Sequence, residues 1–367
     1  MTSVIVAGPL AQKPNHGGHT WVFLQYLLGF RRLDFDVLFI DRLGSNDRST
    51  RCVQSVMNFF GLPFSLIDRD RAVGLGRQEV LARVRRSALL LNVMGFLDDD
   101  EILAAAPKRV FLDIDPGFGQ MWRELGLVDI FAGHDSFVTI GENVGSADCE
   151  VPTCGLDWVT TRQPVVLDQW PVRRSNGGGC FTSVASWRGA YGPLEYGGNR
   201  YGLRVHEFRK FARLPSVTGQ KFELALDIHP DESADLELLS TNRWVLADPR
   251  TVAADPWSYR SYIQRSLAEF MVAKNMYVET RSGWFSDRSI CYLASGKPVL
   301  VQDTGLDGRY PVGDGIVTFS TLDEAVAGVE AIAIEYGRHA EAARATAEDL
   351  FDSDKVLTQL LNSLRIG

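Results

Sequence analysis

Short apolar runs alternate with helix-length segments along most of this sequence. In the first half, the strand-like runs include Val4–Gly8, Val37–Ile40 and Ala88–Val93, with helix-like segments between them. The alternation resumes at Cys180–Ser186 and continues to a last helical segment at Lys355–Leu364. Strands that alternate with helices of this length form parallel sheets covered by helices. We therefore expect an α/β protein.

The alternation weakens between Val151 and Gly179. Prolines interrupt this stretch, which ends in the turn-rich run Ser175–Gly179. Exposed segments rich in proline and glycine commonly connect domains. We therefore predict an amino-terminal domain over residues 1–150, a linker over residues 151–179 and a carboxyl-terminal domain over residues 180–350.

The composition narrows the class of protein. A chain of 367 residues, of which 45% are hydrophobic, is long enough for two domains of ordinary size. The net charge of −8 argues against nucleic-acid binding, which needs a concentrated basic face. No signal-like amino terminus and no run long enough to span a membrane stand out. We expect a soluble cytoplasmic protein.

The cysteines give no sign of a metal site. The five are odd in number and scattered, which is typical of reduced thiols in a cytosolic chain. Only Cys149 and Cys154 lie close together, and no second pair accompanies them. A structural zinc ion needs four ligands, so we expect no metal.

The stretch Thr280–Gly305 reads as a loop, a short helix, a tight turn and a buried strand. Ser286 or Ser282 can cap a helix whose apolar side chains share one face; these are Ile290, Leu293 and Ala294. Gly296 stands where a helix needs a left-handed stop, and Pro298 prevents its continuation. Pro298–Val301 is then a short apolar run suited to a parallel strand.

Polar residues gather at one end of this unit. The amino end of the helix carries Ser286, Asp287, Arg288 and Ser289, and the strand leads into Asp303, Thr304 and Gly305. Ligands of doubly wound sheets bind outside the carboxyl ends of the strands, and helix amino termini favour phosphate. The pattern predicts a phosphate site, although the polar end of such a unit can also be merely solvated.

Two segments resemble a known family. Ala294–Leu300 resembles the A-x-G-x-P-V segment in the carboxyl-terminal domain of nucleotide-sugar glycosyltransferases of the GT-B fold. Gly315–Phe319, followed by Thr321–Ala325, resembles that family's strand and x-x-E-A helix. The resemblance implies two Rossmann-like domains that face each other across a cleft. It also implies a carboxyl-terminal helix, residues 351–367, that packs back toward the amino-terminal domain.

The same resemblance implies an activity. It suggests a metal-independent glycosyltransferase, of hexosyltransferase type, that moves a sugar from a nucleotide-diphosphate donor to an acceptor hydroxyl in the cleft. The carboxyl-terminal domain would hold the donor, with UDP- or dTDP-sugars as the expected co-substrates and no further cofactor. The amino-terminal domain would hold the acceptor, either a small molecule of natural product biosynthesis or a saccharide.

The local sequence patterns and the family resemblance together suggest which residues bind the donor. Adjacent glycines in the first loop of GT-B enzymes let the backbone approach the donor, and Gly17 and Gly18 match them. The leaving diphosphate needs positive charge, for which the candidates near strand ends are Arg188, Lys274, Arg281 and Arg288. Ser286, Asp287, Ser289, Asp303, Thr304 and Gly305 complete the predicted donor site.

The sequence departs from the family at one important pair. Many retaining GT-B enzymes carry two glutamates eight positions apart. Glu279 and Asp287 have this separation, but counting back from Gly296 the family's glutamates fall on Gly283 and Cys291. The retaining mechanism is therefore not carried over. Asp287 either contacts the donor's ribose or only stabilises the positive end of its helix.

An inverting reaction would need a general base. Histidine suits this role because its ordinary pKa is near neutrality. His16 is the first candidate, His19 stands at a helix start, and Asp115 is a rival base or a partner that orients the histidine. Two alternatives stay open: a nucleotide-sugar epimerase of the same fold, and a non-catalytic protein that binds nucleotide sugars.

Overall fold

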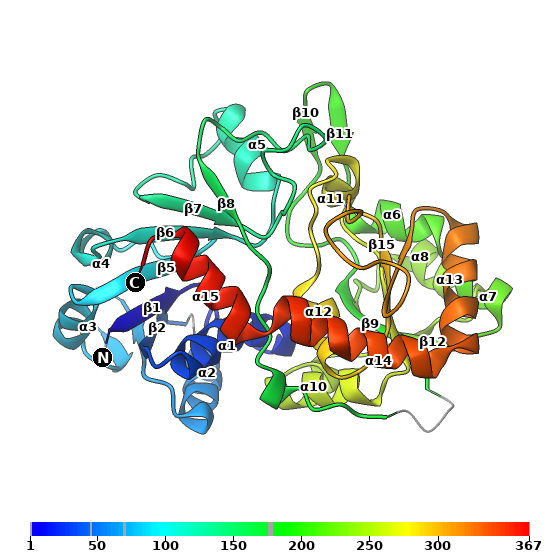
Figure 1. Ribbon diagram of the computed structural model, residues 1–367, viewed down its shortest axis with the longest axis horizontal. Coiled ribbons are helices and arrows are strands. Elements are labelled where there is room, and N and C mark those ends of the chain that lie inside the picture. Colours follow the sequence, from blue (N-terminus) through cyan, green and yellow to red (C-terminus); the bar gives the residue numbers. More distant parts are fainter. Residues whose placement is uncertain (1, 45, 69–70, 175–178, 367) are drawn as a thin grey trace. The chain divides into compact units, whose positions relative to one another are not determined.

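The computed structural model describes residues 2–44, 46–68, 71–174 and 179–366. The chain divides into two compact units (Figure 1). The first comprises residues 1–141, 152–166 and 352–367, and the second comprises residues 142–151 and 167–351. The chain therefore passes from one unit to the other four times.

The first unit is built on an eight-stranded sheet with the order β4-β3-β2-β1-β5-β6-β7-β8. All neighbouring strands are parallel except β3 and β4. β1 and β5 lie at the centre of the sheet and are almost wholly buried, as expected for strands covered on both faces. The strands are β1 Ser3–Ala7, β2 Asp36–Arg42, β3 Phe64–Ile67, β4 Ala72–Gly74, β5 Ser87–Val93, β6 Arg109–Asp113, β7 Ser136–Thr139 and β8 Trp158–Thr160.

Helices from both ends of the sequence cover this sheet. They are α1 Gly17–Arg32, α2 Asp47–Phe60, α3 Arg77–Val84, α4 Asp100–Ala105, α5 Phe118–Glu124 and the final helix α15 Ser353–Ser363. α15 lies beside α1 (Figure 1), and Arg32 of α1 forms an ion pair with Asp354 of α15 at 2.9 Å. The last residues of the sequence thus complete the first unit.

The second unit contains a six-stranded sheet in which every strand is parallel, with the order β13-β12-β9-β14-β15-β16. Numbered within the unit this order is 3-2-1-4-5-6, the Rossmann order, in which the direction of winding changes between β9 and β14. The strands are β9 Phe181–Ser186, β12 Phe222–Asp227, β13 Val245–Ala247, β14 Ala268–Met271, β15 Val299–Gln302 and β16 Ile316–Phe319. The predicted α/β class with parallel sheets is confirmed.

The helices of the second unit connect these strands. They are η1 Leu167–Gln169, α6 Arg204–Lys210, α7 Leu214–Thr218, α8 Ser233–Thr241, α9 Pro249–Val252, α10 Pro256–Arg265, α11 Asn275–Glu279, α12 Asp287–Ala294, α13 Leu322–Ile334, α14 Tyr336–Thr346 and η2 Ala347–Phe351. Phe208, Phe222 and Phe270 lie in the main core, whose closely packed rings are joined by edge contacts.

Three local predictions differ from the structure. The predicted linker contains β8, a strand that pairs with β7 because Trp158 packs on Phe137 in the first unit. The apolar residues within Phe270–Val278 predict a strand, but in the structure the strand begins earlier, as β14, and the chain then forms α11. The segment Tyr191–Gly202, rich in glycine and tyrosine, predicts a loop, but it contains the hairpin β10 Leu194–Tyr196 and β11 Asn199–Tyr201. Residues 175–178 of the predicted turn-rich run lie outside the described residues.

In the part of the chain that the structure describes, no helix is both long enough and apolar enough to cross a membrane. Within the same residues, no group of three or more histidine, cysteine, aspartate or glutamate side chains is arranged to hold a metal ion.

Candidate functional site

The site is best sought at the carboxyl edge of the second sheet, between β9 and β14. In a sheet with this strand order, the loops that follow these two strands diverge and leave a crevice for ligands. Arg188 follows β9 and Lys274 follows β14. The Lys274 side chain extends toward the loop after β9, because a methyl group placed on Gly189 would lie 3.8 Å from its Cε. Lys274 therefore stands at the point where the fold predicts a ligand.

Aromatic rings hold Lys274 in place. Its Nζ lies 5.1 Å from the centre of the Tyr191 ring and 5.3 Å from that of Tyr277. Tyr277 is fully buried and stacks on Trp284 at 4.4 Å. The amine is thus fixed by the β9–β10 loop on one side and by α11 on the other.

Arg188, by contrast, extends into solvent. Its side chain is 64% exposed and forms an ion pair with Glu232. It also borders a hollow of about 640 Å³ beside the carboxyl ends of β9, β12 and β13. The hollow is lined by Trp187, Asp227, His229 and Asp248 among others. Its volume lies in the range of small-molecule sites, which run from about 300 to 1,000 Å³.

The loop after β15 is shaped by its own aspartate. Oδ1 of Asp303 accepts hydrogen bonds from the backbone N–H groups of Gly305 and Leu306, both at 2.9 Å. The guanidinium of Arg281 lies 3.9 Å from the other carboxylate oxygen. Thr304 is fully buried and its hydroxyl donates to the carbonyl of Trp284. Of the predicted residues here, Arg281 and Asp303 reach the surface and the Thr304 side chain does not.

α12 has the ends that the sequence predicts. Oγ of Ser286 accepts a hydrogen bond from the N–H of Arg288, which makes Ser286 the cap. At the other end Gly296 has φ +69°, the left-handed conformation expected of a helix stop. Asp287, the first residue of the helix, is partly exposed at its positive end.

The inner side of this helix start is closed to ligands. Arg288 turns into the core, where its Nε donates to Glu269 at 2.5 Å and Nη1 donates to the carbonyl of Val184 at 2.7 Å. The Ser286 and Ser289 side chains are also buried. The side chains of Ser286, Arg288 and Ser289 therefore point into the core, and a contact of these residues with a donor stays a prediction that concerns their backbone N–H groups. Local sequence cannot reveal this, because Glu269 lies on β14, 19 residues away in the sequence.

The carboxylates Glu279 and Asp287 do not replace the missing glutamates. Glu279 ends α11, is exposed, and accepts a hydrogen bond from Asn275 at 3.2 Å. Gly283 lies in the loop before α12, and Cys291 is buried, with its thiol donating to the carbonyl of Asp287. No carboxylate occupies either family position.

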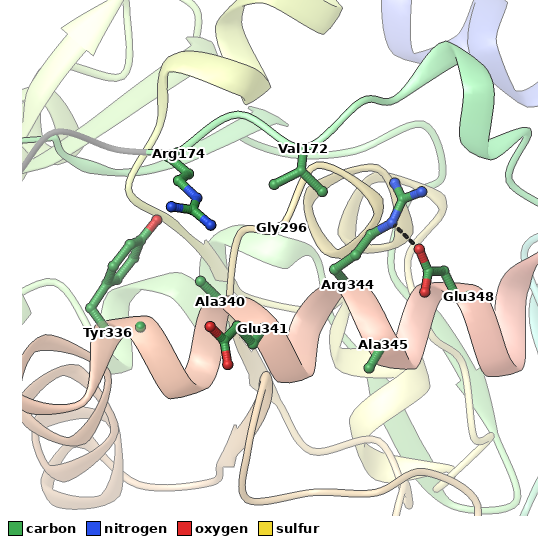
Figure 2. Close-up of a pocket in the computed structure, with 10 residues that line it drawn as sticks. Val172, Arg174, Gly296, Tyr336, Ala340, Glu341, Arg344, Ala345 and Glu348 are labelled. Carbon is green, nitrogen blue, oxygen red and sulfur yellow. Dashed lines mark hydrogen bonds and ion pairs between the residues drawn. The ribbon is translucent and has the colours of Figure 1, made fainter.

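A second hollow, of about 520 Å³, lies at the opposite end of α12 (Figure 2). It is bordered by Val172, Gly296 and α14. Figure 2 shows Arg344 directed to Glu348, and this guanidinium also donates to the carbonyls of Trp170 and Ala294. Arg344 is therefore bound within the protein.

Polar side chains that the sequence did not single out support the site. The buried carboxylate of Glu207 accepts hydrogen bonds from Asn275 and Gln302, at 2.8 and 2.7 Å. Oε1 of Gln302 in turn accepts the N–H of Ala273, the residue before Lys274. Polar residues at the end of a buried strand, such as Gln302, are the sequence signal that points to this network.

In the first unit, the predicted glycine loop is the start of α1. Gly17 and Gly18 form its first turn, and His16 is the residue that precedes it. His16 is exposed, and its Nδ1 lies 2.9 Å from the carbonyl oxygen of Pro14. The first N–H groups of a helix have no partner within it, so this turn can meet an anion or a sugar hydroxyl.

His19 is a poor base. Burial, together with the charge of Lys13, lowers its pKa to about 3. Its ring packs edge-on against Phe23, and Nε2 lies 3.1 Å from the carbonyl oxygen of Pro9, to which it donates when protonated. A group with this pKa accepts protons weakly at neutral pH, so His16 is the better candidate.

Asp115 stands at the same edge of the first sheet, after β6. Its N–H donates to the carboxylate of Asp113 at 3.0 Å. Asp113 is buried, burial raises its pKa to about 6, and it also accepts hydrogen bonds from Gln120 and Thr139. The buried aspartate fixes the backbone that presents Asp115, which is partly exposed.

The lowered pKa of His19 gives a testable pH dependence. The unfolded chain binds a proton at this residue below pH 6.5 and the folded chain only near pH 3, so acid favours unfolding over that interval. We expect the wild type to lose about 2 kcal/mol more stability than His19→Gln between pH 7.5 and 4.5. Urea unfolding of both proteins at each pH measures the difference.

The comparison with the variant is necessary because Asp41 acts in the opposite direction. Burial raises the pKa of Asp41 to about 7, so its contribution to stability falls as pH rises from 3.8 to that value. Both proteins keep Asp41, and its effect cancels. Equal losses in the two proteins would contradict the lowered pKa of His19.

Solved structures show which fold this chain has. A glycosyltransferase from Rickettsia africae aligns over 99% of this chain and 98% of its own, with 11% identity and a TM-score of 0.55. Anabaena HepE in complex with UDP-glucose aligns over all of both chains, with 12% identity and a TM-score of 0.59. The UDP-forming α,α-trehalose-phosphate synthase of Burkholderia xenovorans also aligns over both whole chains, with 10% identity and a TM-score of 0.53.

Sequence comparison alone finds no such relationship, because no family model and no curated protein matches the chain. Because only about one residue in nine is identical, the structural similarity establishes the fold of this chain and not its activity. It agrees with the two parallel sheets, with the Rossmann order of the second and with the return of the last helix to the first unit. The chain has the GT-B fold of these glycosyltransferases.

Proposed function

We propose that this protein is a glycosyltransferase that moves a sugar from a nucleotide-diphosphate donor to an acceptor hydroxyl. The position of Lys274 carries the proposal, because it places a fixed cation at the switch point of a Rossmann-ordered sheet. The similar HepE structure is a complex with UDP-glucose. This supports a UDP-sugar donor, with a dTDP-sugar as the alternative, and a hexose as the transferred sugar.

The donor's diphosphate would lie against Lys274, with Arg281 and the loop Asp303–Gly305 on the β15 side. The bond between the sugar and the diphosphate breaks, and the negative charge that develops on the leaving group is stabilised by these two cations. The chemistry calls for no metal ion. The hollow beside Arg188 on the β12 side is large enough for the nucleoside.

The acceptor would be held by the first unit. Its hydroxyl oxygen forms the new bond to the sugar, and its proton passes to a base, for which His16 is the first candidate and Asp115 the second. Gly17 and Gly18 would present backbone N–H groups to the donor. We propose a small natural product or a saccharide as the acceptor, and the cytoplasm as the place of reaction.

A thermal-shift experiment with UDP, dTDP and UDP-glucose, with ADP as the comparison nucleotide, tests the donor class. A ligand at about 100 times its dissociation constant stabilises the fold by about 2.7 kcal/mol. We expect a rise in the melting temperature with a uridine or thymidine nucleotide. If no uridine or thymidine compound raises it, the proposal is wrong.

One observation favours a second candidate, a non-catalytic protein that binds nucleotide sugars. Gly283 and Cys291 stand where many retaining enzymes of this fold carry glutamates. Measurement of UDP release from UDP-glucose, with and without panels of alcohols and saccharides, separates the two candidates. Binding without release under any condition would favour the second.

A further inference from the structure

Asn143 joins the two loops that border the candidate site in the second unit. Its side-chain amide Nδ2 donates to the carbonyl of Arg281 at 2.9 Å and to the carbonyl of Gly305 at 2.8 Å. Its backbone N–H donates to the carbonyl of Ser282 at 3.1 Å. The remaining oxygen, Oδ1, accepts a hydrogen bond from Arg309 at 3.1 Å. One side chain thus connects the loop before α12 to the loop after β15.

The backbone of both loops is shaped around this side chain. Gly283 and Gly305 have φ angles of +70° and +88°, which favour glycine. A methyl group on Gly283 would lie 2.9 Å from Asn143, and one on Gly305 would lie 2.7 Å from its Nδ2. Arg281 itself has φ +48°, a left-handed conformation that is strained for a residue other than glycine. The hydrogen bond from Asn143 holds this strained residue.

Asn143 reaches this place on a segment anchored at both ends. Residues 142–151 lie between β7 and β8 in sequence but belong to the second unit. The hydroxyl of Tyr310 donates to Glu142, and the N–H of Glu150 donates to the carbonyl of Thr280. Three residues of this segment, Glu142, Asn143 and Glu150, therefore contact the part of the chain that forms the site.

We propose that Asn143 is a positioning residue for the nucleotide donor. By fixing Arg281 and Gly305 relative to each other, it sets where the Arg281 guanidinium and the Gly305 loop meet the donor's phosphates. This inference rests on the proposed function for the identity of the ligand. The proposal adds residues 142–151 to the site, a segment that lies outside the sequence motifs used above to predict the donor site.

Three variants test the role. Asn143→Ala removes all the side-chain hydrogen bonds. Asn143→Asp keeps the shape and the contact with Arg309, but it turns a carboxylate oxygen toward the two carbonyls. Asn242→Ala is the matched control, because Asn242 is also half-buried in the second unit and bonds Leu238 and Ser216, and it precedes β13 at the opposite edge of the sheet.

Two measurements are made on each protein: the dissociation constant for UDP by calorimetry, and amide hydrogen exchange by mass spectrometry. Loss of two hydrogen bonds that orient the site should weaken UDP binding about tenfold or more in both Asn143 variants. Exchange should become faster in residues 280–287 and 302–310. Asn242→Ala should bind UDP as the wild type does, and its faster exchange should be confined to the α8–β13 region.

The outcomes separate this inference from the proposed function. Wild-type UDP affinity in both Asn143 variants would overturn the positioning role. So would unchanged exchange in the two loops, whatever the affinity. If the wild type binds neither UDP nor dTDP, the proposed function fails, and the exchange data alone then decide whether Asn143 holds the loops. Equal weakening in Asn242→Ala would show a general loss of structure and would also overturn the role.

Discussion

Substitution of Glu269 by alanine is expected to lower the free energy of unfolding by about 3–5 kcal/mol, because it leaves Arg288 charged and without its partner in the core. The Glu269 side chain is fully buried and that of Arg288 is only 10% exposed. Guanidinium cannot lose its proton in a protein, so the charge stays. Urea unfolding at neutral pH measures the change.

Two further variants locate the cause. Arg288→Met should destabilise less than Glu269→Ala, because burial raises the pKa of Glu269 and the unpaired carboxyl can take up a proton. The stability of Arg288→Met should therefore improve as the pH is lowered. The pair of Arg265 and Glu223, whose side chains are 56% and 23% exposed, serves as the more solvated control, since Glu223→Ala should change the stability by about 1 kcal/mol or less. A similar loss in Glu269→Ala and Glu223→Ala would contradict a buried-charge effect.

Replacement of Lys274 by methionine is expected to weaken UDP binding about 10- to 100-fold, the range for loss of a hydrogen bond to a charged group. Methionine keeps an apolar stem against Tyr191, so the loss reports on the amine. The dependence of binding on salt concentration should also become weaker. Calorimetry at two ionic strengths gives both quantities.

The control is Lys221→Met. Lys221 is exposed and precedes β12, at the edge of the sheet opposite Lys274. The Lys221→Met variant should bind UDP as the wild type does. If Lys274→Met and wild type bind UDP equally, the switch point of the second sheet is not where the phosphates lie, and the proposed arrangement of the donor is wrong.

Features set by neighbouring residues could be predicted from the sequence. The start of α12 at Ser286, its end at Gly296 and the strand after Pro298 depend on caps and on backbone preferences, which act over a few residues. The alternation of strands and helices predicted the parallel sheets for the same reason. β8 was missed because a strand this short carries too little apolar pattern to be recognised.

Features set by distant residues could not. The sequence suggested Arg288 as a phosphate ligand because no residue near it in the sequence indicates that its guanidinium forms an ion pair with Glu269 of β14. Asn143 lies 138 residues from Arg281, and only the fold brings them together. The glycines at positions 283 and 305 were visible, but the side chain that requires them was not. The placement of polar residues near strand ends was thus predictable, and their individual partners were not.

The four passages of the chain between the units decide how the protein can be divided. A fragment that stops at residue 150 would lack β8, which borders β7, and α15, which covers α1. It would expose an unpaired strand edge and an apolar helix face, both of which promote aggregation. Each unit consists of separate chain segments, so it would have to be expressed as a circularly permuted chain or by co-production of its segments. Truncation at the predicted boundary, after residue 150, cuts through the segment 142–151 of the second unit.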